Sequence, residues 1–285
     1  MKRTLFVSDL DGTLLTHDAK LPEGAAGRIN ALTREGVMVT YATARTVRSV
    51  AFILEDIDFT LPGAVPAALM NGVLVRDMKK GRYIRSAVLD RTKAAAVYSA
   101  VRSSGALEPF VYAVDESNPV EGDPLVTYYH GIANDAMRDF MNERIERFGK
   151  PFIRISSTDE IAGDIIYFAV IGDESNIRRT TAEVGKIDGI RLTCYRDAYA
   201  ENVWYLEIFD ESASKKHALR FLREYTGAER VVVFGDNYND LPMFEEADIA
   251  VAVENAVDEV KKAADFITGD VVGFIENYVN NGERI

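Results

Sequence analysis

The sequence predicts an α/β protein in which a doubly wound parallel sheet is interrupted by an inserted α+β unit. In the first and last thirds of the 285-residue chain, apolar strand-like runs alternate with helix patterns. This order is typical of a parallel sheet with helices on both faces. The middle third carries tyrosine-rich strands of partly alternating polarity, which favour an antiparallel sheet covered by helices on one face. We therefore expect a discontinuous core, residues 1–85 and 199–285, and an inserted unit, residues 86–198.

The N-terminal elements follow a strand–helix–strand order. Leu5–Ser8 is an apolar run that predicts a fully buried strand. A helix is expected from Pro22 to Glu35, because proline suits a first helical turn and Gly36 suits a C-terminal cap. The segment "VMVTYAT" predicts the second strand, and Thr46–Glu55 predicts the second helix.

A third strand and a hairpin end this first segment. "VPAALM" has the composition of a strand of the same sheet. The dipeptide Asn71–Gly72 that follows is a hairpin-turn signal leading into "VLVRD".

In the middle third, "FVYAVD", "LVTYYH" and "IIYFAVIG" are expected strands, and "NDAMRDFMNERIERF" is an expected helix. After "VWYLEIFD" the strand–helix alternation of the core returns. Its expected helices are "SKKHALRFLREYTG", "LPMFEEA" and "VDEVKKAAD", and its expected strands are "RVVVFGD" and "DIAVAV".

Composition and charge narrow the class of protein. With 47% apolar and 27% charged residues the chain has an ordinary globular composition. Its net charge of -12 argues against nucleic acids and anionic membranes as main partners. Cys194 is the single cysteine, so no intramolecular disulfide forms, which fits a reducing compartment. No apolar run approaches the roughly 20 residues of a membrane span. We therefore expect a cytoplasmic protein.

Polar residues follow several expected strands at the point where each strand ends, where open parallel sheets bind ligands. These residues are Asp9 and Asp11 after the first strand, Thr43 and Arg45, with Ala44 between them, after the second, and Asp236, Asn237, Asn239 and Asp240 after "RVVVFG". Each segment alone is compatible with ordinary turn chemistry. Four carboxylates at one sheet edge require a cation, and ligands that are all oxygens favour magnesium over zinc.

Four segments carry a family resemblance. "DLDGT" at Asp9–Thr13, "TAR" at Thr43–Arg45, "SK" at Ser214–Lys215 and "GDNYND" at Gly235–Asp240 resemble the four motifs of the haloacid dehalogenase superfamily of phosphatases. Their order and spacing resemble the Cof-like subfamily, in which a large α+β cap lies between the second and third motifs. The resemblance implies a Rossmann-like core and a cap that selects the substrate.

The resemblance also implies a role for each residue. Asp9 would be the nucleophile that forms an aspartyl-phosphate, and Asp11 would be the general acid and base. The carboxylates of Asp9 and Asp236 and the backbone carbonyl of Asp11 would bind Mg²⁺. Lys215, also catalytic, would neutralise the phosphate and the nucleophile. The phosphate would be bound by the Thr43 hydroxyl, the Ala44 N–H and Asn239. Asp240 would orient Lys215 or a metal-bound water.

Three points stay open in this comparison. The subfamily usually has glycine where this chain has Ala44, although the backbone N–H survives this change. It also has glycine after the motif lysine, whereas Lys216 follows Lys215 here. The pattern Ser-Lys-x-x-Ala-Leu favours Lys215, and Lys216 would take the role if the helix were rotated. Arg45 is a candidate either for contacting substrate beyond the phosphate or for a structural ion pair.

The function expected from these observations is Mg²⁺-dependent hydrolysis of a small phosphorylated metabolite, most often a sugar phosphate in this subfamily. A phosphomutase or phosphotransferase would use the same nucleophile. However, only about 30 residues separate Asp11 from Thr43, too few for the cap that mutases usually insert there. The other alternative is a binding module without catalysis, since a fold does not fix a function. The identity of the substrate and the oligomeric state are not encoded in these motifs.

Overall fold

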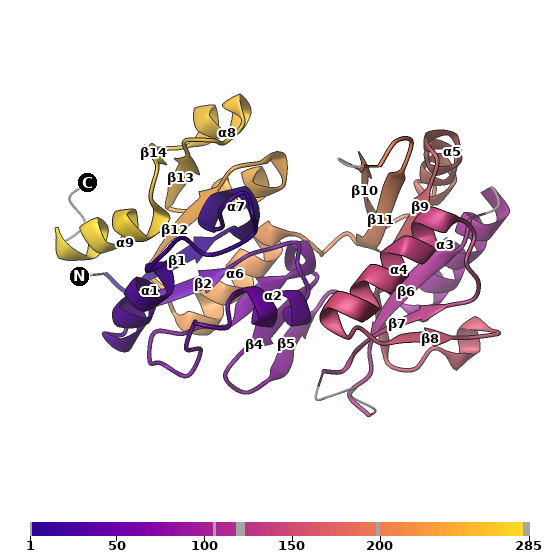
Figure 1. Ribbon diagram of the computed structural model, residues 1–285, viewed down its shortest axis with the longest axis horizontal. Coiled ribbons are helices and arrows are strands. Elements are labelled where there is room, and N and C mark those ends of the chain that lie inside the picture. The colour runs from indigo at the N-terminus through magenta and orange to yellow at the C-terminus, as the bar shows by residue number, and fades with distance from the viewer. Residues whose placement is uncertain (1, 105–106, 118–122, 198–199, 282–285) are drawn as a thin grey trace. The chain divides into compact units, whose positions relative to one another are not determined.

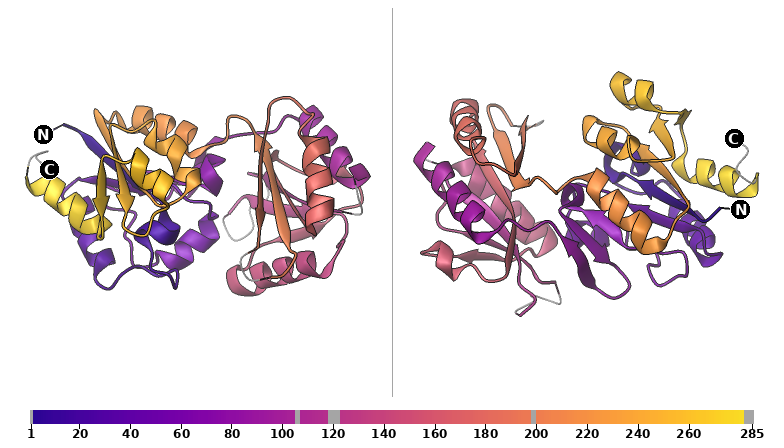
Figure 2. Two further views of the ribbon diagram at one scale, coloured as in Figure 1. Left: turned by 90° about the horizontal axis from the view of Figure 1, so that it is seen from above. Right: turned by 180° about the vertical axis from the view of Figure 1, so that it is seen from behind.

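A computed structural model describes residues 2–104, 107–117, 123–197 and 200–281. The chain forms two compact units (Figure 1). Unit 1 runs up to Arg85 and resumes at Ser214, whereas unit 2 comprises Ser86–Ala213. In both views of Figure 2, the orange and yellow C-terminal elements lie in the same body as the indigo N-terminal elements. The core is therefore discontinuous in sequence.

Unit 1 is built on a parallel five-stranded sheet of order β14-β13-β12-β1-β2. Its strands are β1 (Thr4–Ser8), β2 (Met38–Tyr41), β12 (Arg230–Gly235), β13 (Ile249–Val253) and β14 (Phe266–Thr268). Every neighbouring pair is parallel. All residues of β1 and β2 are buried, as expected of strands covered on both faces. The expected fold class, a doubly wound α/β core with an inserted α+β unit, is confirmed.

The helices of unit 1 are α1 (Ala25–Arg34), α2 (Val47–Ile53), α6 (Lys215–Thr226), α7 (Leu241–Phe244), α8 (Asp258–Ala263) and α9 (Val271–Asn280). Helix α1 is linked to α9 by an ion pair between Arg28 and Glu276. The expectation that Pro22 lies in the first turn of α1 is wrong. Gly24, at a φ of 76°, is the residue before the helix, and Pro22 accepts a turn hydrogen bond from the Ala25 N–H at 3.0 Å.

The third expected strand leaves the main sheet. Two isolated parallel bridges lie between this part of the chain and the main sheet. One joins Ala64, before β3 (Ala67–Leu69), to Val39 of β2, and the other joins Ala68 of β3 to Ala42, just after β2. Strand β3 pairs instead with β4 (Leu74–Asp77) in a three-stranded sheet completed by β5 (Arg82–Ser86). The β3–β4 pair is antiparallel, so the hairpin expected at Asn71–Gly72 is present.

Unit 2 contains a six-stranded sheet of order β10-β11-β9-β6-β7-β8, antiparallel except between β7 and β8. Its strands are β6 (Pro109–Val114), β7 (Leu125–Tyr129), β8 (Phe152–Arg154), β9 (Asp164–Gly172), β10 (Ile190–Arg196) and β11 (Trp204–Asp210). Its helices are α3 (Arg91–Ser104), α4 (Asp135–Phe148) and α5 (Glu174–Val184). Among the described residues, no helix of either unit has the length and apolarity to cross a membrane.

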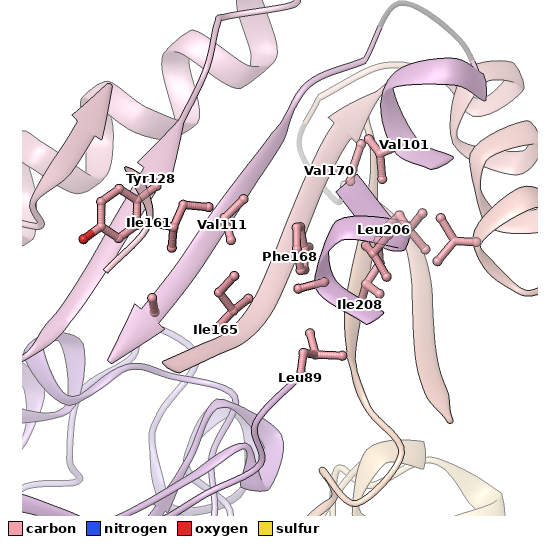
Figure 3. Close-up of a cluster of buried hydrophobic side chains, with 14 of the residues drawn as sticks. Leu89, Val101, Val111, Tyr128, Ile161, Ile165, Phe168, Val170, Leu206 and Ile208 are labelled. Carbon is pink, nitrogen blue, oxygen red and sulfur yellow. The ribbon is translucent and has the colours of Figure 1, made fainter. Parts of the chain in front are cut away.

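Helices cover both faces of this sheet, so the expectation of a single covered face is wrong. Val111, Phe168 and Leu206 belong to the hydrophobic cluster that includes Val101 of α3 (Figure 3). Phe110 lies on the opposite face, since neighbouring residues of a strand point to opposite faces. There Phe140 of α4 stacks on Phe110, with ring centroids 5.5 Å apart.

The second boundary between the units lies later than expected. Residues 204–210 form β11, which pairs with β9 and β10 inside the sheet of unit 2. The chain therefore returns to unit 1 after Ala213 rather than after residue 198, and residues 198–199 themselves lie outside the described residues. Strand pairing with β9 and β10 decides this boundary, and the pattern within residues 204–210 does not reveal it.

Candidate active site

Three adjacent strands deliver the predicted polar residues to one edge of the core sheet. Ser8 at the end of β1 is opposite Phe234 of β12 and Tyr41 of β2. Asp9 continues β1, and its N–H donates to the Phe234 carbonyl at 3.0 Å. Asp236 therefore follows one neighbouring strand and Thr43 follows the other.

Lys215 joins the first and last of these segments. Its Nζ lies 2.6 Å from Asp9 Oδ1 and 2.7 Å from Asp240 Oδ1. Asp9 is 5% exposed, Lys215 is 2% exposed and Asp240 is fully buried. Lys216 points elsewhere and pairs with Glu245 at 2.9 Å. Of the two candidate lysines, the structure thus places Lys215 at the carboxylates.

Local capping explains the position of Lys215. The Ser214 hydroxyl accepts the His217 N–H at 3.1 Å, so Ser214 caps α6 and Lys215 becomes its first residue. Asp240 is held in the same way by backbone donors. Its Oδ2 accepts the N–H groups of Asp236 at 3.0 Å and of Asn237 at 3.1 Å. The lysine and its partner therefore have little freedom to move.

Burial and like charges shift the pKa values of this cluster. The pKa of Asp9 is raised to about 7. Burial is the largest cause, Lys215 opposes the rise, and the charges of Asp240 and Asp236 add to it. Burial and the nearby Asp240 also raise the pKa of Asp236. Burial alone would lower the pKa of Lys215, but Asp9 and Asp240 together keep it above its ordinary value. One buried ammonium thus faces three carboxylates, which leaves negative charge without a cation.

The donor set fits a divalent cation. Carboxylate oxygens of Asp9, Asp236 and Asp240 lie within 4.8 Å of one another. Both Asp240 oxygens already accept hydrogen bonds, from Lys215 and from two backbone N–H groups, so Asp9 and Asp236 are the better placed ligands. All candidate donors are oxygens, as Mg²⁺ prefers. A Cβ on Gly12 would lie 2.4 Å from Asp236 Oδ2, so the loop after β1 closes tightly on this carboxylate.

Asp11 and Arg45 form a bidentate ion pair. Arg45 Nε lies 2.7 Å from Asp11 Oδ2, and Arg45 Nη2 lies 2.5 Å from Asp11 Oδ1. The Asp11 side chain is 47% exposed, in contrast to buried Asp9. The two carboxylates of "DLDGT" therefore have different surroundings. Of the two uses considered for Arg45, the structure shows the ion pair.

The remaining predicted residues surround the same edge. Thr43 is fully buried, and its Oγ1 accepts the Arg45 N–H at 3.2 Å, whereas Ala44 is exposed. Asn239 is exposed, and its Nδ2 lies 3.4 Å from Asn71 Oδ1. All of the predicted site residues belong to unit 1.

Three further residues support the site. Thr13 donates its hydroxyl to Asp236 Oδ1 at 3.0 Å, and Asn255 donates its amide to the Gly12 carbonyl at 2.7 Å. Asn71 faces Asn239. Thr13 lies inside the first motif and Asn71 inside the hairpin signal, so both had a sequence signal, although no role was assigned to them. Asn255 follows β13 by two residues, and the rule that ligands gather beyond strand ends could have found it.

The chain resembles known proteins in sequence and in fold. The family model for haloacid dehalogenase-like hydrolases matches residues 6–272. YitU of Bacillus subtilis (strain 168), named 5-amino-6-(5-phospho-D-ribitylamino)uracil phosphatase, is 27% identical over 296 residues, 97% of this chain and 98% of its own. A haloacid dehalogenase-like hydrolase from Bacteroides thetaiotaomicron matches with a TM-score of 0.75 at 22% identity, covering 97% of this chain and 99% of that chain. The subclass IIB sugar phosphatase BT4131 matches with a TM-score of 0.67 at 17% identity, covering 99% and 100%.

The two solved structures support the fold, and the family model supports the membership. The resemblance noted from the four motifs and the expected enzyme class are confirmed. The chain belongs to the family of haloacid dehalogenase-like hydrolases.

Proposed function

We propose that this protein is a Mg²⁺-dependent phosphatase that hydrolyses a small phosphorylated metabolite through an aspartyl-phosphate on Asp9. The observation that carries the proposal is the buried Asp9–Lys215–Asp240 cluster beside Asp236. It combines a nucleophilic carboxylate, a fixed cation and oxygen ligands for a metal at one sheet edge. A purely structural ion pair would not need the additional carboxylate of Asp236, which accepts the Thr13 hydroxyl and forms no ion pair among the described residues.

In the first half-reaction, an Asp9 oxygen attacks phosphorus and the bond from phosphorus to the leaving oxygen breaks. Lys215 holds Asp9 Oδ1 at 2.6 Å, which leaves the other carboxylate oxygen for the attack. The positive charge of Lys215 also reduces repulsion between the carboxylate and an anionic phosphate. Asp240 fixes the ammonium in this place without competing for the phosphate.

Asp11 is the proposed proton carrier. It gives a proton to the departing alkoxide and then takes one from the water that attacks the phosphorus, which frees Asp9. The two-point contact from Arg45 holds the Asp11 carboxyl in one orientation. Half-exposed Asp11 and buried Asp9 thus suit the roles of proton carrier and nucleophile, respectively.

Asp9, Asp236 and the Asp11 carbonyl would hold the metal, which supplies charge neutralisation for the transferring phosphoryl group. Binding of the phosphate oxygens is assigned to the Thr43 hydroxyl, the Ala44 N–H and the Asn239 amide. Ala44 is exposed, and its N–H has no hydrogen-bond acceptor among the described residues.

For the substrate we propose a small sugar phosphate or a related polyol phosphate. YitU is named for a phosphorylated ribityl compound and BT4131 for sugar phosphates, so both take a hydroxyl-rich carbon chain beside the phosphate. Unit 2 is the proposed cap that selects among such compounds.

The test uses purified protein and p-nitrophenyl phosphate. We expect hydrolysis with Mg²⁺, none in EDTA, and none for Asp9→Asn although its fold stays intact. Asp18→Asn is the matched control, because Asp18 is an exposed acid nine residues after Asp9 and its ion pair, among the described residues, is with His17. Wild-type turnover by Asp9→Asn would refute the mechanism. A panel of phosphorylated sugars and polyols, ranked by kcat/KM, then tests the substrate class.

A further inference from the structure

The segment between β3 and β4 has an unusual backbone. Met70, Asn71 and Gly72 have φ values of 51°, 55° and 87°. Such left-handed conformations are unfavourable for residues with a Cβ, with asparagine the most tolerant of them. Three in succession need support from their surroundings, and Met70 and Gly72 are buried. Strained backbone of this kind occurs most often at functional sites.

This turn is bonded to the segment that carries Thr43 and Ala44. The Asn71 N–H donates to the Thr43 carbonyl at 2.9 Å, and the Met70 N–H donates to the Arg45 carbonyl at 3.0 Å. In a planar trans peptide the carbonyl and the N–H point in opposite directions. Fixing the Thr43 carbonyl toward the turn therefore directs the Ala44 N–H away from it. In the part of the chain that the structure describes, this N–H has no hydrogen-bond acceptor.

The same turn packs against the start of α6. A Cβ on Gly72 would lie 2.2 Å from the Ser214 carbonyl oxygen and 2.9 Å from the Lys215 nitrogen. The backbone of the turn thus contacts the cap of the helix that positions Lys215. The turn also contacts the segment that follows β12, where Asn239 Nδ2 lies 3.4 Å from Asn71 Oδ1.

We infer that the Met70–Gly72 turn is a positioning element for phosphate binding, with Asn71 as its central positioning residue. It directs the Ala44 N–H through the Thr43 carbonyl, and it contacts the elements that carry Lys215 and Asn239. The inference rests on the proposed function in one respect, because it takes phosphate as the ligand of this edge. The hairpin signal Asn71–Gly72 therefore does more than reverse the chain.

The experiment compares Asn71→Val with Asn71→Gly. Valine opposes the left-handed conformation, whereas glycine adopts it freely and keeps the N–H to Thr43. Dissociation constants for inorganic phosphate with Mg²⁺ are measured by calorimetry, kcat is measured with p-nitrophenyl phosphate, and melting temperatures are recorded. We expect Asn71→Val to weaken phosphate binding by about tenfold or more, the factor for one lost hydrogen bond to a charged ligand. The phosphate affinity of Asn71→Gly should stay within about threefold of wild type, because this variant loses only the contact between the Asn71 side chain and Asn239.

The matched control is Asn202→Val, because Asn202 is also an asparagine at a φ of 56° but lies in unit 2. It should lower the melting temperature without weakening phosphate binding. If Asn71→Val does not fold, Asn71→Ala is compared with Asn71→Gly instead, because alanine opposes the left-handed conformation less strongly than valine does. Wild-type phosphate affinity and kcat in Asn71→Val or Asn71→Ala would overturn the inference, as would equal losses in the glycine variant.

The two proposals fail separately. If the wild-type protein binds phosphate but hydrolyses no ester, the proposed function fails, and the Asn71 comparison still decides the role of the turn through phosphate affinity. If the wild type hydrolyses p-nitrophenyl phosphate and all Asn71 variants match it, the inference alone fails. A wild-type protein that neither binds phosphate nor hydrolyses esters would overturn both.

Discussion

Replacing Lys215 by methionine should destabilise the protein strongly and increasingly with pH. The change keeps the length of the side chain but removes the only cation that bonds to Asp9 and Asp240 among the described residues. Carboxylate oxygens of this cluster lie within 4.8 Å of one another. At an effective dielectric constant of about 20, two charges at that distance repel by roughly 3.5 kcal/mol. Breaking a buried ion pair typically costs about 3–5 kcal/mol, which agrees.

The pH dependence follows from the pKa of Asp9. Burial raises this pKa to about 7 from an ordinary value of 3.8, so in metal-free protein the folded state binds an extra proton between these values. Stability therefore falls as pH rises toward 7 and is then constant with respect to this group. Without Lys215 the pKa rises further, because the cation that lowered it is gone. Between pH 7 and 8.5 the variant should keep losing stability, by up to about 2 kcal/mol, while the wild type does not.

The assay is urea unfolding in EDTA at pH 7 and 8.5. Lys216→Met is the matched control, because Lys216 is the next residue on the same helix and its partner Glu245 has a 67% exposed side chain. An ion pair of that kind contributes less than about 1 kcal/mol. The reasoning is refuted if Lys216→Met costs more than Lys215→Met, or if the deficit of Lys215→Met is below about 1 kcal/mol at both pH values. The same variant should also lose phosphatase activity.

Two further variants test the proton carrier and the partly buried Glu207 of unit 2. Arg45→Gln releases the Asp11 carboxyl from its two-point contact. The rate of Asp9 phosphorylation in a single turnover should then fall about tenfold more with an alkyl phosphate than with p-nitrophenyl phosphate, because the p-nitrophenyl leaving group needs no proton. Equal effects on both esters would contradict this role. Burial raises the pKa of Glu207 above its ordinary value of 4.5, although hydrogen bonds from Tyr167 and Tyr195 oppose the rise. The contribution of Glu207 to the free energy of unfolding is therefore complete at low pH and is lost as the pH rises through the raised pKa. Glu207→Gln should remove that loss in melting curves taken between pH 4 and 8, and an unchanged pH profile would show that Glu207 does not titrate with folding.

Much of the site could be predicted because its signals are local. Asp9, Thr43 and Asp236 each follow a strand that an apolar run marks, and parallel strands place such residues at one edge. The choice between Lys215 and Lys216 could not be made in the same way. It depends on where α6 begins, and the Ser214 cap together with buried Asp240 determines that start.

The errors have a common physical origin in contacts between distant segments. Residues 204–210 look like a return to the core, but they pair with neighbouring β10 and with β9, which ends more than 30 residues earlier, and pairing of this kind depends on partners outside the strand itself. Phe140 covers the second face of the unit 2 sheet for the same reason. Asn71–Gly72 was predicted only as a hairpin turn, because its contacts with Thr43, Ser214 and Asn239 join segments far apart in the chain.

The sequence by itself determined the family, the order of the core elements and the carboxylates at the sheet edge, since strand periodicity and motif spacing are properties of neighbouring residues. Only the tertiary structure decided which lysine meets Asp9, that Arg45 pairs with Asp11, and that the Met70–Gly72 turn contacts the elements carrying Thr43, Lys215 and Asn239. These contacts arise from burial and hydrogen bonding between segments that no local pattern connects. The physical reason is that a charge or a strained turn in the interior is stable only when its partners, wherever they lie in the sequence, are brought to it by folding.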